Sequence, residues 1–443
     1  MSKLKRNTVR GVRKAAHLSR RVLSVGANYS GKVENKAHRI INGLDNSIVL
    51  EDKIQFEKLY YESLKYITPL HPALPFAGRK PRTTLLIPSL QKSSFFGGTA
   101  TALIFAAITA NESNTPLAIV ETLKRGRISD SDIEEFFESN NIKLPSGIQR
   151  LDISPRKYNN YGYIDLHPDD VFICSAWWDA YLIQTLPLIK KFIYLIQDYE
   201  PIFYNNSDLY VLAESTYNSD RFVPVCNTEL MLDFMKSKNY QYIAENALYF
   251  EPAVNIGKKI GVEIDNNKSK KTLFVYGRPN VERNLFYTAL KVLDELFTEQ
   301  KLIASEWECY MAGQDGLANI VLSSGAQINS LGKMNMTDYY NFAKSVDLAV
   351  SLMMAPHPSY PPLELSSLGA AVVTTKYETK TDLSRYNKNL FVSDIEIEEL
   401  KKNIIEASNL SSEKRKRNAL ETQLEDDWVK SISQCAKSAL SKA

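Results

Sequence analysis

The sequence predicts an α/β protein made of two doubly wound, mostly parallel domains. Three observations predict this class. From residue 83 to about 250, short apolar runs rich in branched side chains alternate with helical stretches and polar loops, which is typical of parallel strands joined by crossovers. A second series of the same kind begins at residue 272. The segment 255–271 between them is polar and rich in Asn and Lys, so we interpret it as a linker. The length of 443 residues is enough for two domains of ordinary size.

The composition, 44% hydrophobic and 24% charged, is that of a soluble globular protein. The cysteines, Cys174, Cys226, Cys309 and Cys435, are far apart and form no CxxC or Cys/His spacing. We therefore predict reduced thiols rather than a disulfide framework or a zinc site. Apolar runs are too short for a membrane-spanning helix, and no apolar segment of a secretory signal follows the basic N-terminus. These features favour a cytoplasmic protein.

Residues 1–45 are predicted to form a separate basic arm. The first 39 residues contain eleven Lys or Arg and a single acid, Glu34, although the whole chain has a formal net charge of only +3. Leucine, valine and alanine interrupt the charges in the manner of an amphipathic helix that lies on an anionic membrane. A solvated, disordered tail is an equally good interpretation. Binding to nucleic acid is not expected, because no nucleic-acid-binding motif follows.

The first domain is predicted to span residues 46–255. A polar helical lead-in ends in the proline-rich segment PLHPALPFAGRKP, and the first strand is TTLLIPSL at 83–90. A polar loop with Gly97 and Gly98 then leads into a helix of small residues with Thr99 or Thr101 near its start. Strand, glycine loop and helix in this order form the first unit of a doubly wound sheet. Further strands are predicted at PLAIVET, DVFICS, KFIYLIQD, LYVLA, FVPVC and ALYFEP.

The second domain is predicted at 256–418 and a charged C-terminal helix at 419–443. Strands are expected at TLFVYGRP, EWECYMAG, QINSLGK, VDLAV and AAVVTT, with helices at LFYTALKVLDELF and TDYYNFAKSV. In SLMMAPHPSYPPLELSSLG, at 351–369, four prolines predict an irregular loop before a helix that starts near LELSSLG. This places Glu364 near a helix N-terminus at the carboxyl edge of the sheet. A simple capping glutamate is the alternative interpretation of this residue.

The candidate binding and catalytic residues of the second domain follow its strands. Signatures of dinucleotide binding (GxGxxG), of P-loops, of zinc proteases (HExxH) and of serine hydrolases (GxSxG) are absent, so those classes lack support. Arg278, Arg283, Lys333, Tyr360 and Glu364 come after three different strands, whose ends should meet at one edge. Cations, an aromatic ring and a carboxylate suit a nucleoside diphosphate. The alternative is a set of unrelated surface charges.

Several of these segments resemble a known family. GRPNVERN, LGK and HPSYPPLELSSLGAAVVTT are similar to the nucleotide-binding half of GT-B glycosyltransferases of the retaining family-four type. The resemblance is strongest to the WsaF-like group, around the dTDP-rhamnose-dependent rhamnosyltransferase of S-layer glycan assembly. In the first half, FFGGTATAL, SAWWDAY and IYLIQDYEPIFY resemble the same group. The resemblance covers roughly residues 80–435. It implies two Rossmann-like domains facing a central cleft, with the C-terminal helix crossing back.

The resemblance also implies roles for the residues of the second domain. Arg278 and Lys333 would hold the diphosphate and stabilise the leaving group, and they are the expected catalytic residues. Arg283 would share the phosphate role. Tyr360 would pack against the thymine or the deoxyribose, and Glu364 would bind the deoxyribose 3′-hydroxyl.

Further residues are assigned to the sugar or the acceptor. Gly97 and Gly98 would let backbone approach the diphosphate or the acceptor across the cleft. The broader family carries two glutamates, the first of which contacts the donor sugar; here Glu364 matches the second, whereas the first falls on Pro356. The neighbouring His357 is a candidate substitute, and a deoxysugar would tolerate the loss.

The remaining candidates lie in the first domain. Asp198 and Glu200 follow a strand and could orient the acceptor, although helix capping or a turn explains them equally well. Trp178 suits a sugar-stacking surface, whereas one residue of the pair Trp177 and Trp178 is expected in the core.

The predicted function is transfer of L-rhamnose from dTDP-β-L-rhamnose to a growing cell-surface polysaccharide with a lipid-linked acceptor. No metal or other cofactor is expected, and the basic arm would attach the protein to the inner face of the membrane. A donor such as a UDP- or GDP-hexose is the first alternative. A non-catalytic GT-B-like scaffold or glycan-binding module is the second.

Overall fold

The computed structural model describes residues 56–70, 74–92, 95–157, 162–265 and 267–443. The predicted basic arm, residues 1–45, lies outside the described residues. The chain divides into two units, residues 1–63 and 64–443. The described part of the first unit is helix α3 (Phe56–Ser63), in which the rings of Phe56 and Tyr60 stack with centroids 5.3 Å apart. All that follows concerns the second unit.

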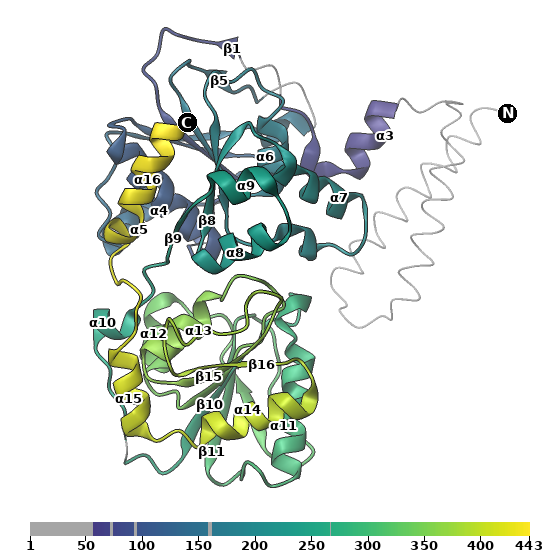
Figure 1. Cartoon of the computed structure of the whole chain (residues 1–443), viewed down its shortest axis with the longest axis vertical. Helices are drawn as coiled ribbons and strands as arrows, with labels where there is room; N and C mark the ends of the chain where they lie inside the picture. Colours follow the sequence, from purple (N-terminus) through teal and green to yellow (C-terminus); the bar gives the residue numbers. More distant parts are fainter. Residues whose placement is uncertain (1–55, 71–73, 93–94, 158–161, 266) are drawn as a thin grey trace, which may run out of the picture. The chain divides into compact units, whose positions relative to one another are not determined.

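The first sheet of this unit contains seven described strands, all parallel, in the order β4-β3-β2-β6-β7-β8-β9. Figure 1 labels β8 and β9 of this sheet. Five of them are buried along their whole length, as expected of a parallel sheet covered on both faces. The strands are β2 (Thr83–Ile87), β3 (Leu117–Glu121), β4 (Ile148–Asp152), β6 (Val171–Cys174), β7 (Phe192–Ile196), β8 (Phe222–Asn227) and β9 (Leu248–Phe250). A separate pair joins β1 (Leu74–Pro75) to β5 (Asp165–Leu166).

The second sheet also has seven described strands, in the order β12-β13-β11-β10-β14-β15-β16. All of its pairings are parallel except that between β12 and β13. The strands are β10 (Lys271–Tyr276), β11 (Trp307–Ala312), β12 (Ile320–Val321), β13 (Gln327–Ser330), β14 (Leu348–Val350), β15 (Ala371–Thr375) and β16 (Leu390–Ser393). The predicted α/β class with two doubly wound sheets is confirmed.

Both sheets are wound in the same way. In each, the chain starts at a central strand, adds strands on one side, returns to the centre and then adds strands on the other side. The reversal falls between β2 and β6 in the first sheet and between β10 and β14 in the second. Open α/β sheets bind ligands at the carboxyl ends of their strands at such a reversal. The loops after β2 and β10 are therefore the first place to look for a site.

Helices connect these strands. Those of the first domain are α4 (Gly97–Glu112), α5 (Asp130–Ser139), α6 (Trp177–Ile183), α7 (Asp208–Ser215), α8 (Glu229–Ser237) and α9 (Gln241–Asn246). Those that follow are α10 (Ile256–Ile260), α11 (Phe286–Thr298), α12 (Met336–Ala343), α13 (Tyr360–Ser367), α14 (Ile397–Ser408), α15 (Ser412–Leu420) and α16 (Trp428–Lys442). In the described part of the chain, none of the helices has the length and apolarity needed to cross a membrane.

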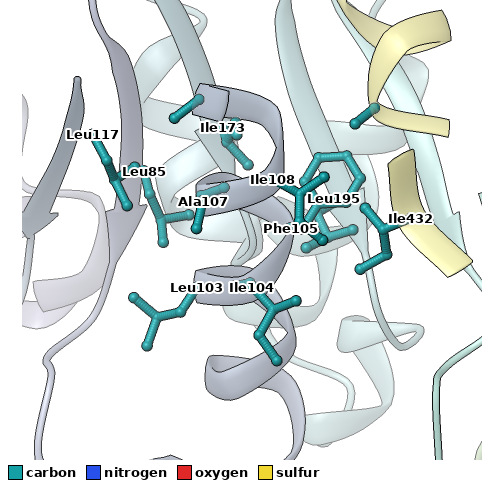
Figure 2. Packing of buried hydrophobic residues seen from close by; sticks show 14 of the residues in the cluster. Leu85, Leu103, Ile104, Phe105, Ala107, Ile108, Leu117, Ile173, Leu195 and Ile432 are labelled. Carbon is teal, nitrogen blue, oxygen red and sulfur yellow. The ribbon is translucent and has the colours of Figure 1, made fainter. Parts of the chain in front are cut away.

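Helix α4 lies at the centre of the first hydrophobic core. Its residues 101–110 are all buried, because one face packs on the sheet and the opposite face on α16. Figure 2 shows Leu85, Leu117 and Ile173 on the strand side and Ile432 of α16 (yellow) on the other. A helix that is apolar on all sides is expected to be buried in this way. The C-terminal helix therefore belongs structurally to the first domain.

Two local predictions are wrong. The run LYVLA was predicted as a strand, but it forms helix α7, in which Ser207 caps the start and accepts from the Tyr210 N–H. A short apolar run fits the repeat of a helix as well as that of a strand. Val211 is exposed, so burial of the run does not favour a strand over a helix. The single C-terminal helix is divided, because Asp427 caps α16 by accepting from the N–H groups of Val429 and Lys430.

The start of α13 also differs from the prediction. The helix begins at Tyr360 rather than near Leu363, and it contains Pro361 and Pro362 in its first turn. The first turn leaves backbone N–H groups without helical partners, so proline is tolerated there. Ser359, at the N-cap, adopts φ +68°, a costly conformation for a side chain other than glycine. This strained entry turns Tyr360 toward the first domain.

Candidate active site

A cavity of about 400 Å³ lies at the carboxyl edge of both sheets. The loop after β2 and the start of α4 form one wall, and the ends of β10, β11 and β13 with helix α13 form the opposite wall. Residues of the segment 253–259, with Asp426 and Trp428, also line the cavity. The predicted residues in its lining are Gly97, Gly98, Arg278, Lys333, Tyr360 and Glu364. The structure thus brings these residues from two domains to one cavity.

The N-terminus of α4 contributes backbone donors to the wall. Gly97 starts the helix with φ +52°, a left-handed conformation that favours glycine. The preceding residue, Phe96, offers no side-chain acceptor to the first turn. The first N–H groups of a helix lack helical partners and carry partial positive charge. This end of the cavity therefore suits an anion.

Arg278 and Lys333 add positive charge to the same cavity. Arg278 stands two residues beyond β10, and Lys333 stands three residues beyond β13 with its ammonium 5.6 Å from the ring centroid of Phe96. Gly313 lets Arg278 lie close to the backbone. A Cβ at Gly313 would be 2.9 Å from the Arg278 Cγ and 3.0 Å from the Gly277 carbonyl oxygen, and φ is +132°. Glycine is therefore needed at position 313, because a larger residue would displace the side chain of Arg278.

Glu364 is a buried carboxylate on α13. Its Oε1 accepts a hydrogen bond from the Tyr340 hydroxyl at 3.3 Å, and the residue is only 8% exposed. Burial raises the pKa of Glu364 to about 7, against the opposing effect of the tyrosine hydroxyls. A carboxylate in such a place gains from a ligand hydroxyl that donates to it.

Tyr360 ties the two domains together across the cavity. Its hydroxyl oxygen lies 2.7 Å from the Thr101 hydroxyl and accepts from the Asn227 amide at 2.8 Å. Because the Thr101 hydroxyl donates to the Gly97 carbonyl at 3.0 Å, we infer that Tyr360 donates to Thr101. Burial raises the pKa of Tyr360 to about 12, so the phenol stays protonated.

A second group of charged residues lies at the domain junction, outside the lining of the cavity. The Arg283 guanidinium stacks 4.1 Å from the ring centroid of Phe203, and its Nε is 3.7 Å from the Asp198 carboxylate. Lys380 is fully buried and donates to the Met353 carbonyl at 3.0 Å. Burial lowers the pKa of Lys380 to about 7 and raises the pKa of Asp198, and the attraction between these two groups opposes both shifts.

Glu200 and Trp178 lie apart from the cavity lining. The Glu200 carboxylate accepts from the Trp177 N–H at the start of α6, at 2.6 Å, and burial raises the pKa of Glu200 to about 8. Trp177 is fully buried and donates from its indole to the Tyr204 hydroxyl at 2.9 Å. Trp178 is half-buried, and its ring lies 5.0 Å from that of Tyr66.

His357 also lies outside the cavity lining, with its ring centroid 5.4 Å from that of Tyr360. Sequence reasoning gave no functional role to four residues that interact with the candidate site residues, although it placed Thr101 near the start of a helix. Lys380 follows a predicted strand, so the strand-end argument could have found it. The others act through contacts that no local pattern indicates. The overlooked residues are Thr101, Asn227, Tyr340 and Lys380.

No group of three or more His, Cys, Asp or Glu side chains within the described ranges is arranged to hold a metal ion. The four cysteines are all buried and unpaired.

The fold and the cavity define the class of protein. Two Rossmann-like sheets with a cavity between their carboxyl edges and a C-terminal helix that crosses back form a GT-B glycosyltransferase fold. Solved structures share it. A glycosyltransferase from Rickettsia africae is 13% identical, with a TM-score of 0.52, and the match covers 82% of this chain and all of that one. HepE from Anabaena, solved with UDP, is 14% identical with a TM-score of 0.51 over 81% of this chain and all of that one.

Sequence models identify the family. The model of the WsaF N-terminal domain matches residues 82–229, and that of the WsaF C-terminal domain matches residues 271–405. Together they cover well over half of the chain, which therefore belongs to the WsaF family of glycosyltransferases. The resemblance seen in the sequence is confirmed.

One curated relative is the O-antigen biosynthesis protein RfbC from Myxococcus xanthus. It is 28% identical over 231 residues, which are 51% of this chain. The match spans only 17% of the length of that protein.

Proposed function

We propose that this glycosyltransferase moves L-rhamnose from dTDP-β-L-rhamnose to a growing, lipid-linked cell-surface polysaccharide. The observation that carries the proposal is the shared cavity. Arg278, Lys333, Glu364 and the N-terminus of α4 all line it. Positive charge suits a diphosphate, and a carboxylate acceptor suits a ribose hydroxyl. The two together match a nucleotide sugar, and HepE, which shares the fold, was solved with UDP.

In the proposed reaction, the bond between the sugar C1 and the diphosphate oxygen breaks as the acceptor hydroxyl attacks C1, and the hydroxyl proton passes to the departing diphosphate oxygen. Negative charge then grows on the departing diphosphate. Arg278 and Lys333 act on this charge, and groups placed before the reaction stabilise it more effectively than water does. We propose that no metal ion takes part, because these two cations and the helix N-terminus supply the positive charge. Tyr360 closes the cavity against water and fixes the domains around the acceptor.

We propose that residues of the first domain orient the acceptor hydroxyl. Asp198 and Glu200 follow β7, and Asp198 lies at the junction, close to Arg283 of the second domain. Gly97 and Gly98 leave room for the donor or the acceptor beside α4. Trp178 presents a half-buried ring on the same domain, where it could stack against a sugar.

The choice of rhamnose is supported by the family and by the position where related enzymes carry a sugar-binding glutamate. Pro356 stands there, so the donor sugar would lose a polar contact. L-rhamnose has no 6-hydroxyl, and it would suffer less from that loss than a hexose with all of its hydroxyls. The polysaccharide acceptor is supported by the relative named for O-antigen biosynthesis. A UDP-hexose is the second candidate donor, because HepE was solved with UDP.

A thermal-shift titration against dTDP, UDP, GDP and ADP, followed by dTDP-rhamnose, tests the donor. A ligand that binds the native state raises the melting temperature by mass action. We expect dTDP to stabilise the protein more than the other nucleotides. A preference for UDP or GDP would reject rhamnose as the donor and keep the enzyme class. No shift with any nucleotide would favour a non-catalytic scaffold.

The variant Arg278→Ala separates an enzyme from a scaffold. Loss of a charged hydrogen bond costs about 1.5–3 kcal/mol, so dTDP affinity should fall roughly 10- to 100-fold. Arg417→Ala, on the exposed face of α15, is the matched control and should keep wild-type affinity. Unchanged dTDP affinity in Arg278→Ala would contradict the assignment of the diphosphate to this cavity.

We further propose that the enzyme is cytoplasmic and that the basic arm attaches it to the anionic inner face of the membrane, where a lipid-linked acceptor would lie. Deletion of residues 1–45 should abolish sedimentation with vesicles containing anionic lipid, and neutral vesicles serve as the control. The deleted protein should still bind dTDP, since all the residues assigned to the nucleotide come after residue 45 in the sequence. Equal sedimentation of both proteins would reject the membrane role.

A further inference from the structure

A buried carboxylate, that of Glu121, ends strand β3 at the carboxyl edge of the first sheet, outside the lining of the cavity. The residue is only 1% exposed, and its register partner at the end of β2 is Ile87. The chain that leaves β2 leads into α4, and the chain that leaves β3 leads into α5. Glu121 therefore stands where these two connections leave the sheet side by side. A charge buried there is costly unless it is paired and hydrogen-bonded.

The carboxylate of Glu121 joins the two connections. Its Oε1 accepts from the N–H of Leu90, after β2, at 2.8 Å and from the N–H of Gly126, after β3, at 2.6 Å. Its Oε2 accepts from the Arg150 guanidinium at 3.0 Å. All three partners are donors, so an ionised carboxylate satisfies them together. A glutamine of the same shape would have to direct its NH₂ group at one of these donors.

Arg150 extends this arrangement to the start of α5. Its guanidinium donates to the carbonyl of Gly126 at 3.2 Å and to that of Ile128 at 2.7 Å, directly before the residue that caps α5. A Cβ at Gly126 would lie 1.5 Å from the Leu90 carbonyl oxygen, so the two connections approach as closely as glycine permits. The pair of Glu121 and Arg150 thus fixes the connection to α4 and the connection to α5 against each other.

The two connections meet again beside the cavity. Phe95, two residues before α4, stacks on Phe136 of α5, with ring centroids 4.4 Å apart and an angle of 18° between the planes. Phe96, Gly97 and Phe136 all line the cavity. The N-terminus of α4 is therefore supported by α5, and both helices are entered from segments that Glu121 and Arg150 hold.

We propose that Glu121 is a positioning residue for sugar transfer, which fixes the N-terminus of α4 where negative charge develops on the departing diphosphate. The proposal rests on the proposed function, in which this N-terminus receives the diphosphate. Fixed dipoles stabilise a developing charge well because they do not have to reorient during the reaction. A loosened N-terminus would still meet a bound nucleotide, but it would stabilise the transition state less. The loss should therefore appear in kcat more than in the KM for the donor.

The variant Glu121→Gln tests this role in the full chain. We expect kcat for sugar transfer to fall about 10- to 100-fold, because a small displacement of preorganised groups has effects of this size. The KM for the donor should stay within about threefold of the wild-type value. A fall in kcat is to be read only at temperatures where circular dichroism shows the variant to be folded.

Asp347→Asn is the matched control. Asp347 is also buried, at 7% exposed, and its carboxylate accepts from the Thr272 N–H at 2.8 Å and from the Arg415 guanidinium at 2.7 Å. It precedes β14, at the edge of the second sheet opposite to the cavity. Both variants neutralise one member of a buried ion pair, so both should lower the melting temperature. Only Glu121→Gln should lower kcat. Equal kcat in the two folded variants would overturn the positioning role.

A second measurement needs no substrate. Hydrogen–deuterium exchange of the backbone amides of residues 101–104 reports the first turn of α4, because these are the first N–H groups that bond within the helix. Exchange should be faster in Glu121→Gln than in the wild type and unchanged in Asp347→Asn. Unchanged exchange in Glu121→Gln would overturn the proposal. If Glu121→Gln fails to fold, Glu121→Asp, which keeps the charge and withdraws the carboxylate by one methylene, replaces it in both measurements.

Failure of the proposed function looks different. A wild type that transfers no sugar would reject that function, and exchange in α4 would still decide whether Glu121 positions the helix. A wild type that prefers a UDP-sugar would reject rhamnose as the donor and change only the substrate with which kcat is measured.

Discussion

The phenol oxygen of Tyr360 lies 2.7 Å from the hydroxyl of Thr101, joining residues that are 259 positions apart in the sequence. One residue starts α13 of the second domain, and the other stands in the second turn of α4. Asn227, at the end of β8, holds the same phenol at 2.8 Å. A single hydroxyl thus links both domains beside the cavity, and its removal should be measurable.

The variant Tyr360→Phe keeps the ring and removes only this hydroxyl. Asn227 and Thr101 are almost completely buried, so their polar groups would lose a partner without gaining water. We expect a loss of about 1–3 kcal/mol in the free energy of unfolding, measured by urea denaturation. A double-mutant cycle with Asn227→Ala should show a positive coupling energy. Additive losses in the cycle would mean that the contact is not formed in solution.

Glu364→Gln should change stability and binding in opposite directions. The folded pKa of about 7 lies above the ordinary value of 4.5, so between these values the native state holds the extra proton. The contribution of Glu364 to stability must therefore fall as pH rises from about 4.5 to 7, by at most roughly 3 kcal/mol. The glutamine variant lacks this dependence, so it should match the wild type near pH 4.5 and be more stable at pH 8.

Urea unfolding across this pH range provides the measurement. Nucleotide binding should respond in the other direction, because a neutral amide is a weaker acceptor for a ribose hydroxyl than a carboxylate. We expect about a tenfold rise in the Kd for dTDP at pH 8. A difference in stability between the wild type and Glu364→Gln that stays constant from pH 4.5 to 7 would contradict the burial of this carboxyl.

Gly313→Ala and Gly316→Ala form a matched pair. Both glycines have positive φ, +132° and +77°, so both variants should lose about 1 kcal/mol through backbone strain. At Gly316 the added methyl meets nothing within 4 Å, whereas at Gly313 it meets the side chain of Arg278. Only Gly313→Ala should therefore weaken dTDP binding. Equal binding by the two variants would show that Arg278 does not depend on Gly313.

Removal of metal ions should leave the reaction intact. Glycosyl transfer measured after treatment with excess EDTA should stay within twofold of the untreated rate, because Arg278 and Lys333 are proposed to neutralise the diphosphate. Addition of Mg²⁺ or Mn²⁺ to the treated enzyme is the control. Activity that vanishes with EDTA and returns with one of these ions would reject the proposed metal-free reaction.

The cavity could be approached from sequence because its residues follow strands. Arg278 and Lys333 come just after apolar runs, and parallel strands bring their carboxyl ends to one edge. The left-handed start of α4 likewise follows from paired glycines after a strand. These features depend on patterns only a few residues long.

Other features depend on contacts between distant segments, which no local pattern encodes. Lys380 is buried beside Asp198, from the other domain, and Tyr360 finds its partners at Thr101 and Asn227. Helix α7 shows the same limit on a smaller scale. The run Leu209–Ala213 fits a strand as well as a helix, and the serine cap before it decides the outcome.

Packing of α16 against α4 has a consequence for the order in which the protein is made. Ile432 and Ala436 complete the core around Phe105, although strands β2 to β9 of that domain are finished by residue 250. The ribosome completes every described strand of the second domain, residues 271–393, before it adds this helix. Domains usually fold in the order of synthesis. Here the first domain cannot complete its core until the second domain has been translated. An apolar face of α4 stays uncovered until α16 emerges.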